Sequence, residues 1–250
     1  MDLDPDLAAL RPLGGFFVLR TTGAAGADPV RRLPTLADAY ADTRPDVHRV
    51  PLTFRVGVVA RRLGASEPRV SASIAQLGLA ARLWSAALGC AALYGRVPDL
   101  DPGLLRWDPE AGTPDDLWLT EVRRALPGTA AVLTDAVLHA HLRPLGEALR
   151  ARYGIAAGLL WGNAGSALAG AAGELDRWAR GNGRGEVADR ARALTAELFA
   201  HPLLRRTGTF AGTAFRRRSC CLYYRAPGGG LCGDCCFTRP PHPSPRAPSA

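Results

Sequence analysis

One long helical stripe limits the chain to folds with a large apolar helix among their central elements. Apolar residues recur along it at alternating spacings of four and three, namely Val70, Ile74, Leu77, Ala81, Trp84, Leu88 and Ala91. Side chains three and four positions apart lie on one face of an α-helix. The stripe begins after the cap-like residues 66–68, and Gly95 follows it in a C-terminal capping position, just before Pro98. We therefore expect one continuous helix here.

Other helical patterns surround this one. Further helices are predicted over residues 33–43, 131–153, 155–180 and 186–200. The second of these contains Pro144, which predicts a kink, and Gly154 ends it. The third carries Gly162, Ser166 and Gly170 four positions apart, a spacing that favours close approach of another backbone.

Short β elements complete the predicted fold. Residues 105–119 hold two apolar pieces with tryptophans around a turn rich in Pro, Gly and Asp, which predicts a hairpin over the helical core. Residues 14–20 could form one short strand. We expect a mainly α fold, a bundle of about five helices with a small β-hairpin and a C-terminal cysteine-bearing hairpin. The expected organisation has four parts: an irregular segment 1–50, a helical domain 51–215, a cysteine motif 216–238 and a disordered tail 239–250.

The net charge of +8 does not indicate a nucleic-acid binder. The chain has no lysine, its arginines are spread along the whole length, and no helix-turn-helix or aromatic-interleaved basic motif is present. The first ten residues include three aspartates and lack the basic start and apolar core of a secretory signal, so we expect a cytoplasmic protein. No uncharged stretch approaches the roughly 20 residues that span a bilayer. We therefore expect no transmembrane segment, with peripheral contact at the inner face of the membrane left open.

Five of the six cysteines lie between residues 220 and 236. Cys220 and Cys221 are adjacent, ten residues follow, and Cys232 and Cys235 then form a C-x-x-C pair. Between the pairs, residues 222–226 alternate like a strand and residues 227–230, Pro-Gly-Gly-Gly, suit a tight reversal. The two pairs are therefore expected to meet at the open end of a hairpin.

Three kinds of site could use these thiols. A disulfide is disfavoured because cytosolic thiols are kept reduced. A structural zinc ion accepts four thiolates, but its usual knuckles are two C-x-x-C turns, and adjacent residues in an extended segment point to opposite faces. A [2Fe-2S] cluster offers two separated pairs of ligand positions, so the adjacent pair is less of a handicap. Geometry alone favours iron-sulfur over zinc and leaves both open.

The spacing CC-x10-C-x2-C, with SCCLYYR before the turn and GLCGDC after it, resembles the FhuF-like ferric siderophore reductase family. Weaker similarity extends to residues 74–85 and 159–168. The resemblance implies a [2Fe-2S] cluster held by Cys220, Cys221, Cys232 and Cys235, which reduces ferric siderophores in the cytoplasm. Cys236 departs from the pattern and could exchange with Cys235 if the turn relaxed.

The resemblance also frames the remaining expectations. The candidates for docking a bulky ferric complex, of hydroxamate type, are Trp161, Asn163, Tyr223, Tyr224 and Arg225, although a tryptophan such as Trp161 is more often simply part of the core. The arginines at 216, 217, 218 and 225 should raise the cluster potential, and could steer an anionic complex or an acidic donor such as a ferredoxin, or form a solvated basic rim. A flavin reductase is the other expected donor.

Histidines and the remaining cysteine are expected to be bystanders. No Ser-His-Asp, Cys-His or paired-carboxylate arrangement stands out, and one-electron transfer requires none. His139 and His141 are two positions apart, which predicts different helix faces and solvated side chains. Cys90 lies among apolar residues of the long helix and should be a small buried hydrophobe. The predicted function is reduction of siderophore-bound Fe(III) with release of Fe(II). The alternatives are a non-enzymatic iron-sulfur or siderophore-binding protein, and a zinc-stabilised interaction module.

Overall fold

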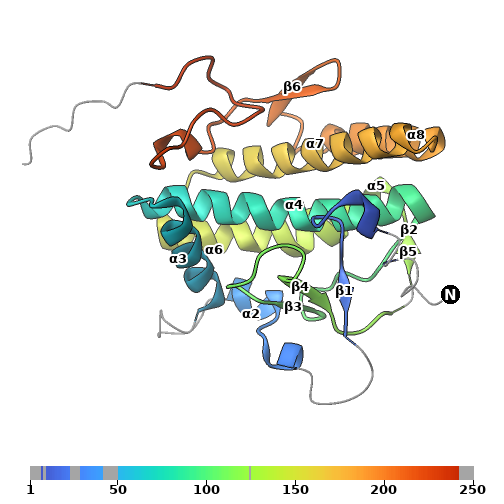
Figure 1. The fold of residues 1–250 in the computed structure, drawn as a ribbon, viewed down its shortest axis with the longest axis horizontal. Coiled ribbons are helices and arrows are strands. Elements are labelled where there is room, and N and C mark those ends of the chain that lie inside the picture. Colours follow the sequence, from blue (N-terminus) through green and yellow to red (C-terminus); the bar gives the residue numbers. More distant parts are fainter. Residues whose placement is uncertain (1–6, 8–9, 23–28, 42–49, 124, 242–250) are drawn as a thin grey trace, which may run out of the picture.

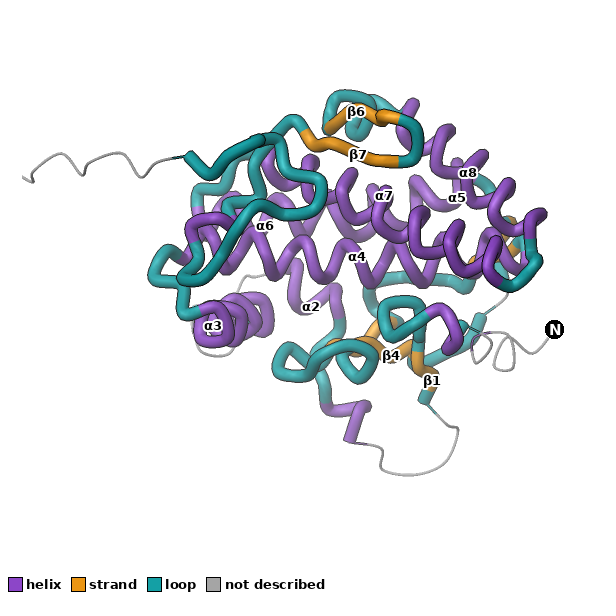
Figure 2. The backbone as a smooth tube through the Cα atoms, turned by 45° about the horizontal axis from the view of Figure 1, so that its top comes forward, coloured by secondary structure: helices purple, strands orange, loops and turns teal. Residues whose placement is uncertain are grey.

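Helices form the middle of the molecule, with a different kind of segment on each side of them. The computed structural model describes residues 7, 10–22, 29–41, 50–123 and 125–241. The C-terminal segment lies along one side of the helices, and a small sheet with the N-terminal part of the chain lies along the opposite side (Figures 1 and 2). The mainly helical fold predicted from the sequence is confirmed. Of the predicted disordered tail, residues 242–250 lie outside the described residues.

The predicted long helix is α4, Pro68–Tyr94, and it is the most central element of the core. It packs against helices on several sides, including α3 (Pro51–Leu63), α7 (Ala157–Gly181) and α8 (Gly185–Ala200). Gly95 ends it with a φ of 66°, in the left-handed region that favours glycine. Helix α4 also has the length and apolar character of a membrane-crossing helix, but 72% of its most apolar window is buried inside the molecule. Such burial is what a core helix shows.

Helix α3 was not predicted, although its sequence carries a helical signal. Leu52, Val56, Val59 and Leu63 are spaced by four, three and four, and all four contact the apolar core. Pro51 stands at the first helical position, where its missing N–H costs nothing, and Gly64 ends the helix with a φ of 60°. The predicted helix over residues 33–43 is shorter than expected in the described part of the chain, as α2, Leu36–Ala41.

The predicted helix at 131–153 is continuous but changes its hydrogen-bond register. It consists of α5 (Ala130–Leu133), a π-helical stretch (Thr134–Leu142) and α6 (Arg143–Tyr153). The π-helical stretch ends immediately before Arg143-Pro144. Proline has no N–H to continue the regular ladder, so the change of register falls where the kink was predicted. Gly154 ends α6 as expected, with a φ of 61°.

His141 lies in this π-helical stretch, and the prediction that it is solvated was wrong. Its side chain is fully buried, whereas His139 is exposed. Nε2 lies 2.6 Å from the carbonyl oxygen of Leu100, so this nitrogen carries the proton, and Nδ1 lies 2.8 Å from the hydroxyl of Tyr40, which donates to it. The ring therefore links the π-helical stretch to Tyr40 in α2 and to the loop at Leu100.

Acid should unfold the protein partly through His141. Burial lowers its pKa to about 4, against about 6.5 in an unfolded chain, so the unfolded state binds the proton first as pH falls. Stability supplied by the neutral ring is complete above about pH 6.5 and should decline by up to about 3 kcal/mol as pH falls toward 4. Urea unfolding should show that the difference in free energy of unfolding between wild type and His141→Gln becomes smaller as pH falls over this range. His139→Gln is the matched control, and equal pH slopes for wild type and His141→Gln would contradict the prediction.

The small sheet confirms the predicted hairpin. Strands β3 (Leu105–Trp107) and β4 (Leu117–Leu119) are antiparallel with Leu105 opposite Leu119, and β1 (Arg20–Thr21) adds in parallel to β4. The prediction of a strand over residues 14–20 was wrong except at its last residue, because residues 15–17 form a turn. Two further pairs are β2 (Arg96–Val97) with β5 (Leu126–Pro127), and β6 (Gly208–Ala211) with β7 (Ala214–Arg217).

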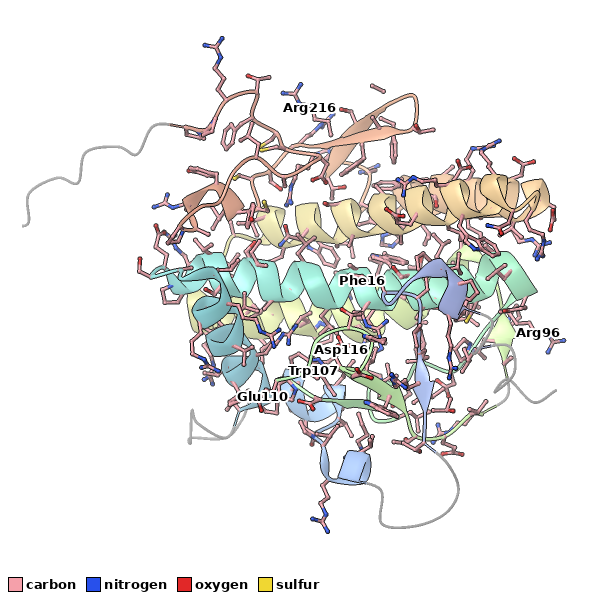
Figure 3. All side chains as sticks on the ribbon, viewed as in Figure 1. Phe16, Arg96, Trp107, Glu110, Asp116 and Arg216 are labelled. Carbon is pink, nitrogen blue, oxygen red and sulfur yellow. The ribbon has the colours of Figure 1, made fainter. Side chains whose placement is uncertain are left out.

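A buried ion pair fastens the N-terminal part of the chain to α4. Arg82 is 1% exposed and its Nε lies 2.9 Å from Oδ1 of Asp116, which is 4% exposed. The same guanidinium donates to the carbonyl oxygens of Gly15, Phe16 and Val18. Phe16 and Asp116 are labelled beside α4 in Figure 3. One side chain thus supplies the hydrogen-bond donors for carbonyl oxygens that are not paired in a strand.

Candidate metal centre

The cysteine segment lies over the N-terminal part of α7 and reaches α4. It follows β7 directly, and Figure 1 shows it crossing the face of α7 that is turned away from the small sheet. Ser219 donates from its hydroxyl to the carbonyl oxygen of Gly158 on α7 (2.9 Å). Ser73 on α4 donates from its hydroxyl to the carbonyl oxygen of Cys221 (2.7 Å). The first cysteine pair is therefore anchored to two core helices through its own backbone and its neighbour.

Small residues on α7 make this approach possible. A Cβ on Gly162 would lie 2.0 Å from Oγ of Ser219, and one on Gly165 would lie 2.3 Å from Oγ1 of Thr207. The predicted close approach occurs at Gly162, but the approaching atoms belong to the side chains of Ser219 and Arg217 and not to a backbone. The prediction was wrong at Gly170, where an added Cβ would meet nothing within 4 Å. The contact face runs through 158, 162 and 165, and not along the spacing of four that ends at 170.

Replacing Gly162 with alanine should displace the cysteine segment. The new methyl group needs the space of the Ser219 side chain, and overpacking of this kind costs about 1–3 kcal/mol. We expect Gly162→Ala to hold less iron and sulfide per chain than wild type after anaerobic purification. Gly170→Ala is the matched control on the same helix and should match wild type. Equal metal content in both variants would show that Ser219 yields without moving the cysteines.

The chain reverses between the two cysteine pairs, but without the predicted strand. Residues 223–225 form a short 3-10 helix, so the prediction of a strand at 222–226 was wrong. Leu222 has a φ of 69°, and Gly228 has the same value. A Cβ on Gly229 would lie 2.2 Å from the carbonyl oxygen of Tyr223, so only glycine fits there. These backbone features, rather than strand pairing, bring the two pairs together.

One sulfur from each pair meets at the end of this reversal. Sγ of Cys221 lies 3.6 Å from Sγ of Cys232. Sγ of Cys220 accepts the N–H of Leu222 (3.2 Å), and Sγ of Cys235 accepts the N–H of Phe237 (3.5 Å). Backbone N–H groups directed at sulfur stabilise negative charge there. Cys221 is buried, while Cys220, Cys232, Cys235 and Cys236 are partly exposed, and Cys90 is buried in α4 as predicted.

The thiols of this group differ in pKa. The hydrogen bond between Cys221 and Cys232 lowers the pKa of Cys221 to about 6 and raises the pKa of Cys232. Burial raises the pKa of Cys220 to about 11 and also raises that of Cys236. Neighbouring thiols repel the charge of a thiolate at Cys220, which is among the causes of its raised value. Several thiolates at one place therefore need a cation or a metal to compensate them.

The donor set fits a thiolate-bound metal centre such as a [2Fe-2S] cluster. For a thiolate–metal distance of about 2.3 Å, two thiolates on one tetrahedral metal ion lie about 3.8 Å apart. The separation of Cys221 and Cys232 is close to this value. A [2Fe-2S] cluster binds through two pairs of thiolates, and this distance suits one such pair.

The residues predicted to dock a bulky complex do not form one surface. Asn163 is fully buried and its amide is engaged by Ser73 and Arg217. Tyr223 and Tyr224 are partly exposed beside the cysteines, and the Tyr224 ring packs edge-on against Phe237 at 5.9 Å between centroids. Arg225 pairs with Glu67 (2.6 Å) at the surface. The two tyrosines are thus the predicted residues that stay accessible next to the thiols.

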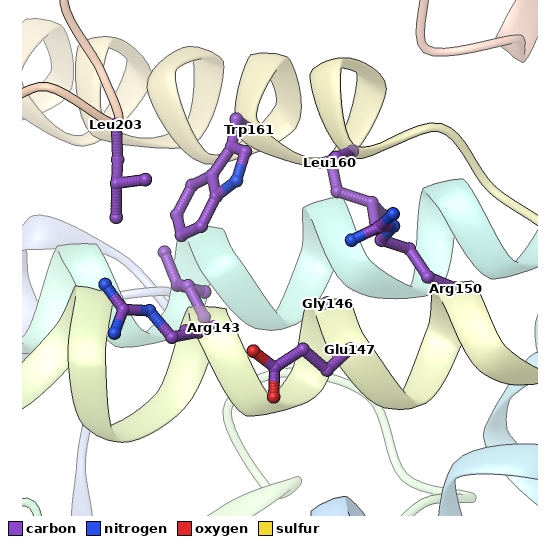
Figure 4. Close-up of a pocket in the computed structure, with 9 residues that line it drawn as sticks. Arg143, Gly146, Glu147, Arg150, Leu160, Trp161 and Leu203 are labelled. Carbon is purple, nitrogen blue, oxygen red and sulfur yellow. The ribbon is translucent and has the colours of Figure 1, made fainter.

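Trp161 faces a different part of the molecule. It lines a pocket of about 180 Å³ between α6 and α7, together with Arg143, Glu147, Arg150 and Leu203 (Figure 4). Pockets for drug-sized ligands span roughly 300–1,000 Å³. This space is therefore too small to enclose a bulky chelate, and packing between the two helices accounts for Trp161.

A polar network beneath the cysteines was not predicted. Ser73 and Asn163 are both 0% exposed, and Nδ2 of Asn163 donates to the carbonyl and hydroxyl oxygens of Ser73 (3.0 and 3.1 Å). Oδ1 of Asn163 accepts Nη2 of Arg217 (2.5 Å). The alternation of residues 214–217 could have shown that Arg217 points inward with Phe215, while Arg216, labelled in Figure 3, is exposed. No sequence signal marked Ser73.

Two family models match the chain. The one described as ferric iron reductase FhuF-like transporter covers residues 78–211, just over half of the chain. The one described as FhuF 2Fe-2S C-terminal domain covers residues 217–237, which includes all five clustered cysteines. A search of curated proteins found no match. The 2Fe-2S description agrees with the donor set described above.

Proposed function

The chain belongs to the family of FhuF-like ferric iron reductases, and on this ground we propose that it passes single electrons to ferric iron held by a siderophore in the cytoplasm. The observation that carries the proposal is the match of residues 217–237 to a 2Fe-2S domain, in which four of the five thiols are partly exposed beside accessible aromatic side chains. When bound, the cluster supplies one electron at a time. Hard oxygen ligands hold Fe(II) far less well than Fe(III), so this electron is enough to release the metal.

The proposed ligands are Cys220, Cys221, Cys232 and Cys235. Cys221 and Cys232 would share one iron, because their sulfurs already have the separation of two thiolates on one tetrahedral ion. Cys220 and Cys235 would hold the other iron, and each has a backbone N–H directed at its sulfur. The buried Cys221 would lie on the protein side and the partly exposed thiols on the solvent side.

The substrate is proposed to dock at the surface and not in a cavity. Tyr223 and Tyr224 offer aromatic faces and hydroxyls beside the thiols, which suits a hydroxamate complex whose iron is buried in its own ligand. Electron transfer needs proximity to the cluster but no enclosure of the chelate. Exposed Arg216 and Arg218 would attract an anionic complex or an acidic donor such as a ferredoxin, with a flavin reductase as the other donor class.

Anaerobic mixing tests this function directly. The full chain is purified without oxygen, analysed for iron and sulfide, reduced, and mixed with a ferric trihydroxamate while its visible absorption is followed. We expect the bands of the oxidised cluster to return as Fe(II) appears, trapped by a ferrous chelator. A cluster that stays reduced would favour a non-enzymatic iron-sulfur protein. Colourless protein with one zinc ion and no sulfide would instead indicate a zinc-stabilised module.

A further inference from the structure

Arg217 is a buried cation without a carboxylate partner. It is 2% exposed, and in the described residues no ion pair includes it. Arg216 and Arg218, on either side in the sequence, are exposed. Removing a charge from water is costly unless a counter-charge or hydrogen bonds compensate it. A negative partner would therefore stabilise the buried charge of Arg217 further than hydrogen bonds to neutral groups do.

Neutral groups hold the guanidinium in one orientation and leave part of it free. Nε donates to the carbonyl oxygen of Ser219 (2.6 Å) and Nη2 donates to Oδ1 of Asn163 (2.5 Å). Asn163 is itself fixed by Ser73, whose hydroxyl donates to the carbonyl oxygen of Cys221. Nη1 is buried and has no hydrogen-bond partner in the structure. The network thus fixes the direction of a charged group and leaves one donor nitrogen unused.

Cysteines bound as thiolates would place negative charge next to Arg217. The backbone N–H of Arg217 donates to the carbonyl oxygen of Asp234 (3.0 Å), so Arg217 contacts the C-x-x-C turn as well as the segment that leads to Cys220. Its guanidinium Nε donates to the carbonyl oxygen of Ser219, the residue before Cys220. Arg217 is therefore hydrogen-bonded to both arms of the motif.

We propose that Arg217 is the buried counter-charge of the cluster, a positioning residue held by Asn163 that raises the cluster's reduction potential. The inference rests on the proposed cluster at the four cysteines. Uptake of one electron adds one negative charge to the cluster, and a fixed, desolvated cation stabilises this more negative form more than the oxidised form. Burial shields the interaction from salt, whereas the exposed Arg216 and Arg218 act through water and are screened.

Four variants of the full chain separate this role from that of the basic rim. Arg217→Gln removes the charge, Arg217→Lys keeps it, and Arg216→Gln and Arg218→Gln are the matched controls. Each protein is purified anaerobically, and its midpoint potential is measured by redox titration of the visible absorption at low salt and at about 0.5 M NaCl, where the Debye length is only a few Å.

Arg217→Gln should lower the ratio of reduced to oxidised cluster at least tenfold at a fixed solution potential, which corresponds to about 59 mV for one electron. The shift should persist at high salt, and Arg217→Lys should recover most of it. Shifts for Arg216→Gln and Arg218→Gln should be smaller and should vanish with salt. A shift in Arg217→Gln no larger than in these controls would overturn the proposal.

A second variant keeps the test decisive if Arg217→Gln fails to retain the cluster. Asn163→Asp places a carboxylate against Nη2, which neutralises Arg217 in place with nearly unchanged volume. Its potential should fall in the same direction, and an unchanged or raised potential would overturn the proposal. Reoxidation of the wild-type cluster by the ferric hydroxamate is scored separately. If wild type is not reoxidised but the potentials shift as stated, the reductase function fails and the role of Arg217 stands.

Discussion

Serine in place of Cys220, Cys221, Cys232 or Cys235 should leave the purified chain without its cluster. A serine hydroxyl keeps its proton at neutral pH and is a much poorer iron ligand than a thiolate, and each of the four proposed ligands completes the coordination of one iron. Iron and acid-labile sulfide should fall to near background in each variant, and the visible bands should disappear. Metal and sulfide analysis of anaerobically purified protein measures the effect.

Cys90→Ser and Cys236→Ser are the controls for this series. Cys90 is buried in α4 far along the chain from the motif, and Cys236 lies next to the proposed fourth ligand. Both variants should keep a wild-type spectrum. A wild-type spectrum from one of the first four variants would reassign the ligands. Loss of the cluster in Cys236→Ser together with its retention in Cys235→Ser would place Cys236 in the fourth position.

Replacement of Arg82 by methionine should cause the largest loss of stability from one substitution outside the cysteine motif. Asp116 would remain as a buried carboxylate without its partner, and the carbonyl oxygens of Gly15, Phe16 and Val18 would lose their donor. Breaking a buried ion pair by removing one partner costs about 3–5 kcal/mol. The loss should appear as a lower urea midpoint and a lower Tm in unfolding followed by circular dichroism.

A more exposed ion pair provides the comparison. The side chains of Arg20 and Asp115 are 35% and 59% exposed, so Arg20→Gln should cost much less than Arg82→Met, about 1 kcal/mol. Adding Asp116→Asn to Arg82→Met should restore part of the lost stability, because it removes the unpaired charge. A loss of less than about 1 kcal/mol in the free energy of unfolding of Arg82→Met would show that water reaches Asp116 and that the ion pair is not buried.

Periodic elements were predictable from the sequence, and elements set by tertiary contacts were not. Helix α4 and the β3–β4 hairpin follow from local spacing alone, because their apolar residues repeat at the period of the element. The spacing of α3 carried the same signal but was not recognised. By contrast, the turn at Gly15 is held by Arg82, which lies more than sixty positions away, and no local pattern encodes such a contact.

The candidate site divides in the same way. The four cysteines and the reversal between them could be proposed because their spacing is local. The conformation of residues 222–226 could not, since alternation predicted a strand where Leu222 and the glycines impose a 3-10 turn. The support beneath the thiols joins α4, α7 and β7, and its residues lie as much as 148 positions apart. Only the folded chain brings Ser73 to Cys221.

The docking of the cysteine segment on α7 also bears on how the protein opens. The main apolar cluster of the described residues extends from Leu7 to Leu204, and none of its fully buried members comes from the segment after β6 begins. That segment is held by polar contacts, by a close fit over glycines and by a few apolar contacts, such as Leu222 with the apolar cluster and Phe215 with Phe199, so we expect it to detach as a separate cooperative unit while the helices stay folded. A cluster bound by both cysteine arms would stabilise this unit. Loss of the cluster would expose the segment to proteases under conditions in which the helices remain folded.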